Sequence, residues 1–188
     1  MEAEGTEAKA TLISKSRLEF LVDGIFAIAM TLLVLELKVP ELAERTSSGE
    51  LWRHLVGHYR VFFSFFLSLG ILAIFWYRHQ QIYHRLSRIT FRALLLHLVF
   101  IVSVVFFPFC ASLLGRYPGN PLSNVLYLGD FLVFQAGITL LWADAARQGA
   151  IAADIGPDQI TLDRKRNLKG LLIISMLFLA NAARIAIQ

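Results

Sequence analysis

Residues 17–36 read RLEFLVDGIFAIAMTLLVLE, and this stretch decides the fold class. Between Phe20 and Leu37 only Asp23, near the start, and Glu36, near the end, carry a charge. A helix needs about 20 mostly apolar residues to cross the hydrocarbon core of a bilayer. The stretch meets that length and predicts a membrane-spanning helix.

The rest of the chain has the same apolar character. Of the 188 residues, 56% are hydrophobic and 17% are charged, which is more apolar than a soluble domain of this length. The apolar runs are continuous and do not alternate with polar residues as the strands of a membrane barrel would. We therefore expect a single transmembrane domain over 1–188, an all-α polytopic membrane helical bundle. Its five helices are predicted at about 18–38, 55–78, 92–115, 123–145 and 167–187.

The connections between these helices lie alternately on the two sides of the membrane, and Lys and Arg are distributed unequally between the two sides. Twelve lie on the side of the N-terminus and six on the other side. Because cytoplasmic loops are enriched in Lys and Arg, we expect a multi-pass protein of the cell membrane with a cytoplasmic N-terminus. The net charge of +4 is assigned to contact with anionic lipid headgroups and not to nucleic acid. An odd number of spans suggests that a sixth helix is missing from this chain.

One face of the first helix combines small, branched and hydroxyl side chains. Gly24, Ile28, Thr31, Leu32 and Leu35 follow one another at spacings of four, three, one and three residues, which places them on one side of a helix. Around an axis of symmetry, several copies of this face would form apolar rings and a hydroxyl layer, a lining that can gate a pore by dewetting. The alternative to a pore is that this face makes ordinary contacts with other helices or with lipid. Periodicity alone favours this alternative.

Asp23 lies where a bare charge is costly to desolvate. We expect its carboxylate either to find donors on neighbouring helices or to face a wet cavity. A carboxylate that still reaches interfacial water is the alternative.

These residues carry a resemblance to a known family. The stretch from Arg17 resembles the opening helix of the transmembrane protein 175 family of potassium channels, whose pattern is Arg, three residues, Phe-Ser-Asp and an apolar helix. Arg17, Asp23 and residues 26–35 match, whereas Leu21 and Val22 stand where the family has Phe and Ser. The similarity continues through three shorter segments, 75–79, 95–99 and 107–109, and then through the fourth helix and the basic run before the fifth, to about residue 187. Members of the family generally have six spans.

The resemblance implies a homotetramer in which four copies of helix one line a pore with a modest preference for potassium ions. It assigns Ile28, Leu32 and Leu35 to a hydrophobic constriction and Thr31 to the hydroxyl beside it. It also implies a cytoplasmic network that ties helix one to its neighbours, formed by Arg17, Asp23, Trp76 and His79. A narrow apolar ring obliges a cation to shed water, which costs less for potassium than for sodium.

Two other functions stay open from the sequence. A secondary or proton-coupled transporter could use Asp23, His97 and Asp130 as relay groups, although no internal inverted repeat supports it. A membrane scaffold that binds partners through helix faces would conduct nothing. Saturable, substrate-coupled flux would favour the first, and a dry, fully packed face on helix one would favour the second.

Enzymatic and metal chemistry find no support in the sequence. It has no phosphate-cradling glycine loop, nucleophile elbow or paired carboxylates, so we expect no enzyme and no cofactor. His54 and His58 are one helical turn apart, but no third ligand of suitable type is near them in sequence. We therefore expect no metal site.

Overall fold

The computed structural model describes residues 14–42 and 47–186, and helices account for most of them. Their order is α1 (Lys15–Leu32), the 3-10 turn η1 (Leu33–Glu36), α2 (Ser48–Gly57), α3 (Tyr59–His84), α4 (Phe91–Arg116), α5 (Pro121–Arg147) and α6 (Pro157–Ala186). Within these described ranges, five helices are long and apolar enough to cross a membrane, which confirms the predicted all-α class and the five spans.

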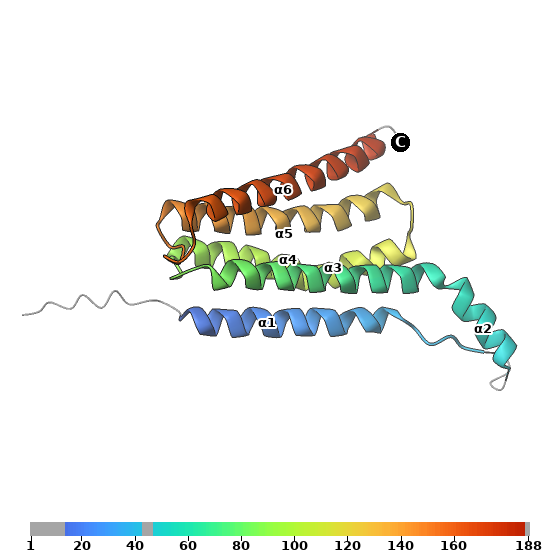
Figure 1. Ribbon diagram of the computed structural model, residues 1–188. Coiled ribbons are helices and arrows are strands. Elements are labelled where there is room, and N and C mark those ends of the chain that lie inside the picture. The colour runs from blue at the N-terminus through green and yellow to red at the C-terminus, as the bar shows by residue number, and fades with distance from the viewer. Residues whose placement is uncertain (1–13, 43–46, 187–188) are drawn as a thin grey trace, which may run out of the picture.

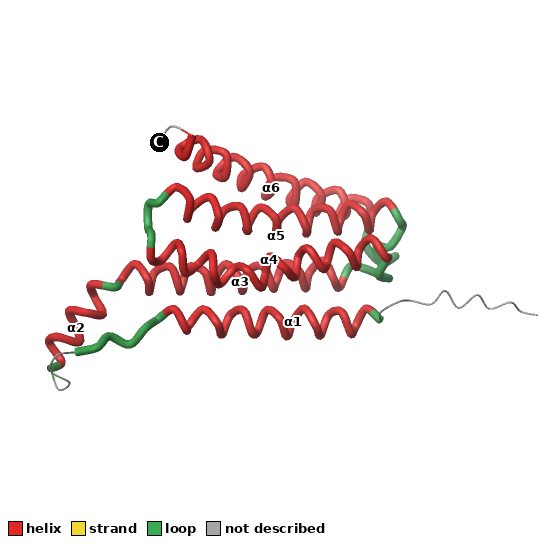
Figure 2. The backbone as a smooth tube through the Cα atoms, turned by 180° about the vertical axis from the view of Figure 1, so that it is seen from behind, coloured by secondary structure: helices red, strands yellow, loops and turns green. Residues whose placement is uncertain are grey.

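The long helices lie side by side in a simple order. Figures 1 and 2 show α1 along one flank, α3 and α4 in the middle, then α5, with α6 on the opposite flank. α1 packs on both α3 and α4, whereas α6 packs on α5. The short helix α2 projects from the end of the bundle where α1 finishes and α3 begins.

Local sequence signals explain where the helices start. Ser14, Thr90 and Asn120 each cap the helix that follows, because a side-chain oxygen accepts a hydrogen bond from a backbone N–H of the first turn. Pro121 occupies the first position of α5, where a missing N–H is tolerated. These caps place the turns between spans at the ends of the bundle.

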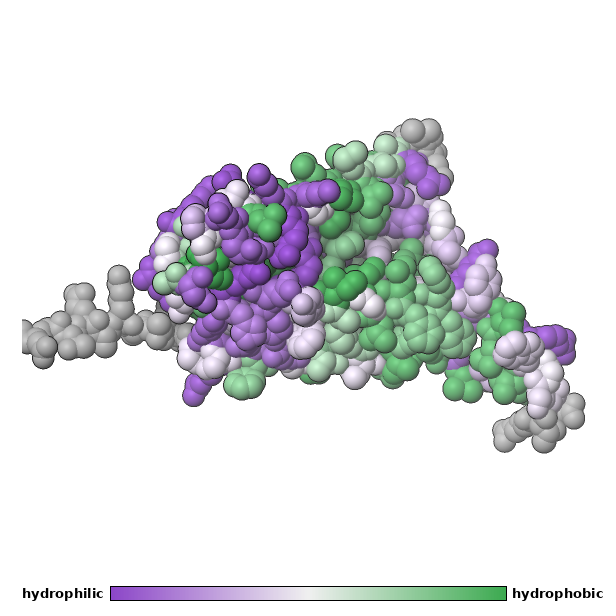
Figure 3. Space-filling model, viewed as in Figure 1, coloured by the Kyte–Doolittle hydropathy of each residue, from purple (hydrophilic) through white to green (hydrophobic). Residues whose placement is uncertain are grey.

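The two ends of the bundle differ in polarity. The end where α1, α4 and α6 begin, called here the basic end, carries most of the Lys and Arg residues. Figure 3 shows hydrophilic residues gathered there and hydrophobic residues along the middle of the helices. Loop 85–90 is joined to loop 148–156 by two backbone hydrogen bonds of 2.8 Å, from Ser87 N to Ala150 O and from Ala152 N to Arg85 O.

Two predicted helix starts differ from the observed ones, and the second span also ends at His84 and not at 78. The second span begins at Tyr59, because residues 48–57 form the separate helix α2, capped by Ser47. The last span begins at Pro157, ten residues before the predicted start at 167. Its polar first turns remain helical because Asp163 and Asn167 are buried against the bundle.

Gly115 lies at a close contact between α4 and α3. A Cβ at this position would lie 3.2 Å from Ser64 Cβ and 3.6 Å from Val61 Cα. Ser64 is held in place because its hydroxyl donates to the Ala111 carbonyl at 2.8 Å. We expect Gly115→Ala to lower the free energy of unfolding by about 1 kcal/mol through overpacking.

Gly70→Ala is the matched control for this substitution, because a Cβ at Gly70 meets nothing within 4 Å. Alanine is the better helix former, so this variant should unfold at the wild-type temperature or slightly above it. Thermal unfolding in detergent compares the two variants. Equal melting temperatures would contradict a tight contact at Gly115.

Candidate functional site

Helix α1 is attached to the bundle along one stripe. Leu18, Val22, Phe26 and Ala29, followed by Leu33 in η1, are all buried. Their spacings of four, four, three and four residues place them on one side of the helix. Phe26 contacts Phe100 of α4, with ring centroids 5.8 Å apart. This stripe accounts for the packing of α1 on α3 and α4.

The opposite side of α1 is open. Ile28 is 60% exposed and Leu35 is 67% exposed, and Leu32 and Thr31 are exposed beside them. These are the four residues that the sequence assigned to the constriction. They lie together on one face and contact little of their own chain. The face is therefore available to lipid or to another copy of the protein.

Thr31 is the one hydroxyl on this face. Its Oγ1 donates to the carbonyl of Ile28 at 2.8 Å, a bond that uses its single proton. The acceptor lone pairs of the hydroxyl remain open. A layer of such oxygens offers ligands to a cation, whereas the neighbouring Ile and Leu side chains offer none.

Asp23 ties α1 to α3 near the basic end. Its Oδ1 accepts from Trp76 Nε1 at 2.9 Å and also from Gln80 Nε2. Trp76 is a member of the network expected from the sequence, whereas Gln80 is not. Gln80 lies one helical turn after Trp76 on the same face of α3, and this spacing was the signal that could have found it.

Arg17 and His79 lie apart from this carboxylate. Arg17 is exposed, and its guanidinium has no hydrogen bond or ion pair within residues 14–42 and 47–186. His79 is 1% exposed and packs among aromatic rings, including Tyr83 at 5.0 Å and Phe100 at 4.9 Å between centroids. Neither of its ring nitrogens has a hydrogen-bond partner in the described part of the chain.

The two hydrogen bonds to Asp23 should contribute to the free energy of unfolding, and substitution of Asp23 measures that contribution. We expect Asp23→Ala to lower the free energy of unfolding by about 2 kcal/mol, because two donors lose a charged acceptor. Asp23→Asn keeps a carbonyl oxygen in place and should lose less. Thermal melts of the purified protein would report both changes. A wild-type melting temperature for Asp23→Ala would show that the bonds do not hold α1.

Polar networks join α6 to the rest of the bundle at the basic end. Asp163 is ion-paired with Arg85, the residue that follows α3, and with Arg166, the latter at 3.1 Å. Arg78 of α3 donates to Gln135 Oε1 at 2.6 Å and to Asn167 Oδ1 at 3.0 Å. The contacts of Arg78 and Arg85 were not predicted, because each joins residues more than 50 positions apart in sequence.

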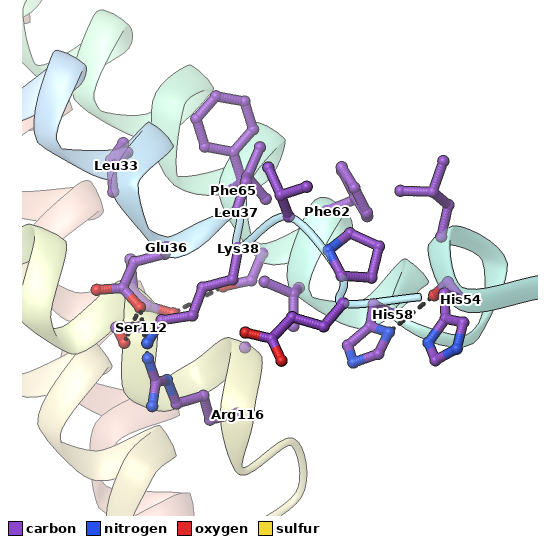
Figure 4. Close-up of a pocket in the computed structure, with 18 residues that line it drawn as sticks. Leu33, Glu36, Leu37, Lys38, His54, His58, Phe62, Phe65, Ser112 and Arg116 are labelled. Atoms are coloured by element: carbon purple, nitrogen blue, oxygen red, sulfur yellow. Dashed lines mark hydrogen bonds and ion pairs between the residues drawn. The ribbon is translucent and has the colours of Figure 1, made fainter. Parts of the chain in front are cut away.

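The opposite end of the bundle contains a cavity of about 430 Å³, called here the Glu36 cavity. It lies between η1, residues 37–41, the end of α2, the start of α3 and the end of α4. Figure 4 shows Glu36, Ser112 and Arg116 together on one side of it and His54 and His58 on the other. Arg116 and Ser112 bind Glu36 Oε2 at 3.2 and 2.6 Å.

The remaining candidate residues are separate from one another. His58 Nδ1 lies 2.8 Å from the His54 carbonyl, and within the described ranges no three His, Cys, Asp or Glu side chains gather as a metal site would require. His97 and Asp130 are buried on α4 and α5. Each has one side-chain atom without a hydrogen-bond partner among the described residues, His97 Nε2 and Asp130 Oδ2.

Comparisons with known proteins identify relatives with this architecture. The family described as "Endosomal/lysosomal potassium channel TMEM175" matches residues 17–108. A potassium channel of Chamaesiphon minutus is 31% identical over 140 residues, which cover 73% of this chain and 68% of the relative. A potassium channel of Streptomyces collinus is 31% identical over 101 residues, covering 54% of this chain and 48% of the relative.

A solved structure extends the similarity to most of the chain. The crystal structure of a lysosomal potassium-selective channel TMEM175 homolog from Chamaesiphon minutus superposes with a TM-score of 0.77 and 26% sequence identity. The match covers 90% of this chain and 87% of the other. It agrees with the resemblance seen at Arg17, Asp23 and residues 26–35, and the family consists of channels and not of enzymes. The chain therefore belongs to the TMEM175 family of potassium channels.

Proposed function

We propose that this chain is a subunit of a potassium-permeable, modestly potassium-selective channel whose pore is lined by α1 from four copies. The observation that carries the proposal is the open face of α1, where Ile28, Thr31, Leu32 and Leu35 lie opposite the buried stripe. A bundle of α1 copies around an axis would cover this face and give each apolar side chain a symmetry-related neighbour.

The chemistry of that face supports a hydrophobic constriction. Ile28, Leu32 and Leu35 have no polar atoms in their side chains, so a narrow ring of them cannot replace the water that a cation loses. The dehydration cost is smaller for the larger, more weakly hydrated potassium ion, and this difference gives the preference. Thr31 adds a layer of hydroxyl oxygens beside Ile28. Its open lone pairs would ease the passage of a partly hydrated ion.

The orientation proposed for the subunit follows its charge distribution. The basic end holds the start of α1 and most of the Lys and Arg residues, and cytoplasmic segments are enriched in both. We therefore place the N-terminus in the cytoplasm and the protein in the cell membrane. Labelling of a cysteine introduced at Ser14 should occur only from the cytoplasmic side, and labelling from outside would reverse the orientation.

The ion flux of the purified protein tests the function directly. In liposomes of defined lipid composition, the protein should pass potassium faster than sodium, without saturation by substrate and without coupling to protons. Native mass spectrometry of the same preparation should give four subunits. Proton-coupled, saturable flux would instead support a transporter. A well-folded tetramer that passes no ion would contradict the channel.

A further inference from the structure

The Glu36 cavity has the size and chemistry of a ligand site. Its volume of about 430 Å³ lies within the range of small-molecule pockets. Most of its wall is apolar, and the side chains that form it are Leu33, Leu37, Leu55, Val61, Phe62 and Phe65. A wall of this kind favours a hydrocarbon group.

Cationic groups with unused donors stand at the rim of the cavity. The guanidinium of Arg116 bonds to Glu36 through one nitrogen, and its side chain is 51% exposed, so its remaining N–H groups are open. Lys38 also lines the cavity, and its ammonium has no ion pair within the described ranges, although the carboxylates of Glu36 and Glu41 line the cavity as well. Arg and Lys donors of this kind bind phosphate oxygens well.

The position of the cavity argues for a membrane lipid over a soluble ligand. Three spans meet there, because one ends at Glu36, the next begins at Tyr59 and the third ends at Arg116. The rim therefore lies at the level of the lipid headgroups, and the apolar wall faces the hydrocarbon. The neighbouring helix α2 exposes Leu51, Trp52 and Val56, a composition typical of a helix in the membrane interface.

We propose that the Glu36 cavity binds one membrane phospholipid, with an acyl chain against Phe62 and Phe65 and the phosphate on Arg116 and Lys38. The polar rim then contacts the headgroup of the lipid, and the apolar wall contacts an acyl chain of the same lipid. The α2 helix and residues 37–41 form the outer side of the cavity, so the bound lipid also fixes these segments at the bilayer surface.

Lipid retention by the full-length protein tests this site. Native mass spectrometry in detergent would be used with dioleoylphosphatidylglycerol as the probe. The wild type should retain one probe molecule per subunit, and dioleoylglycerol, which lacks the phosphate, should be retained much less. Arg116→Gln should weaken the binding of the probe about tenfold, the loss expected for one charge-assisted contact, and Arg116→Lys should restore part of it.

Two further variants distinguish a lipid inside the cavity from lipid bound elsewhere on the protein. Val61→Trp fills the cavity and should abolish retention, whereas Arg53→Gln removes an exposed cation of α2 outside the cavity and should change nothing. Circular dichroism and the melting temperature establish that each variant is folded. Equal retention by the wild type, Arg116→Gln and Val61→Trp would mean that the lipids are annular and would overturn the proposal. A loss of subunits in Val61→Trp without a change in lipid retention would assign the cavity to a second copy of the chain and would also overturn it.

Discussion

Ile28→Asn should lower the potassium-over-sodium flux ratio of the reconstituted protein to about one. In the proposed pore, four amide groups would replace an apolar ring, and a cation could then pass while keeping more of its water. The side chain of Ile28 is largely exposed, so the substitution removes little packing within the protomer. Flux of each cation into liposomes, measured at equal protein content, gives the ratio.

Ile173→Asn is the matched control for Ile28→Asn. Ile173 is an exposed isoleucine of α6, which lies on the flank of the bundle opposite α1. Its substitution should leave the flux ratio unchanged. If both variants, or neither, changed the ratio, Ile28 would not line the path of the ion.

Asp163→Ala should cause the largest loss of protomer stability, about 3 kcal/mol. The carboxylate is nearly inaccessible, with 3% of its side chain exposed, and it is paired with Arg85 and Arg166. Its removal leaves the partly buried Arg85 guanidinium without its anion and detaches the first turns of α6 from loop 85–90. Chemical or thermal unfolding of the purified protein would measure the loss.

Asp154→Ala provides the comparison for Asp163→Ala. Asp154 carries the same charge, but it is exposed in the turn before α6 and has no ion pair in the described segments. Exposed charges of this kind contribute little to stability, so the variant should unfold within about 0.5 kcal/mol of the wild type. Similar losses in the two variants would point to net charge and not to the buried ion pair.

The membrane-spanning architecture could be predicted because it depends on local composition. Five apolar runs near the length of a bilayer crossing are visible without tertiary information, and the structure contains five such helices. The start of α6 was not predicted because residues 157–167 are mostly polar. From sequence alone a polar segment is assigned to a loop, since its burial against other helices is not known. Helix α2 was missed because its ten residues are too short to give a distinct membrane signal.

The site was predictable only where it depends on helical spacing or on family resemblance. Spacing placed Ile28, Thr31 and Leu35 on one face, and resemblance paired Asp23 with Trp76. The bonds of Arg78 to Gln135 and Asn167 depend on how α3, α5 and α6 meet in space. The Glu36 cavity likewise forms from five segments, and no short motif encodes such a juxtaposition.

The division of α1 into a buried stripe and an open face has an evolutionary consequence. Leu18, Val22 and Phe26 hold the helix in the protomer, whereas Ile28 and Leu35 contribute little to that attachment. Substitutions on the open face are therefore nearly neutral for folding of the protomer. Selection that acts on what this face contacts can change these positions without loss of the scaffold that carries them.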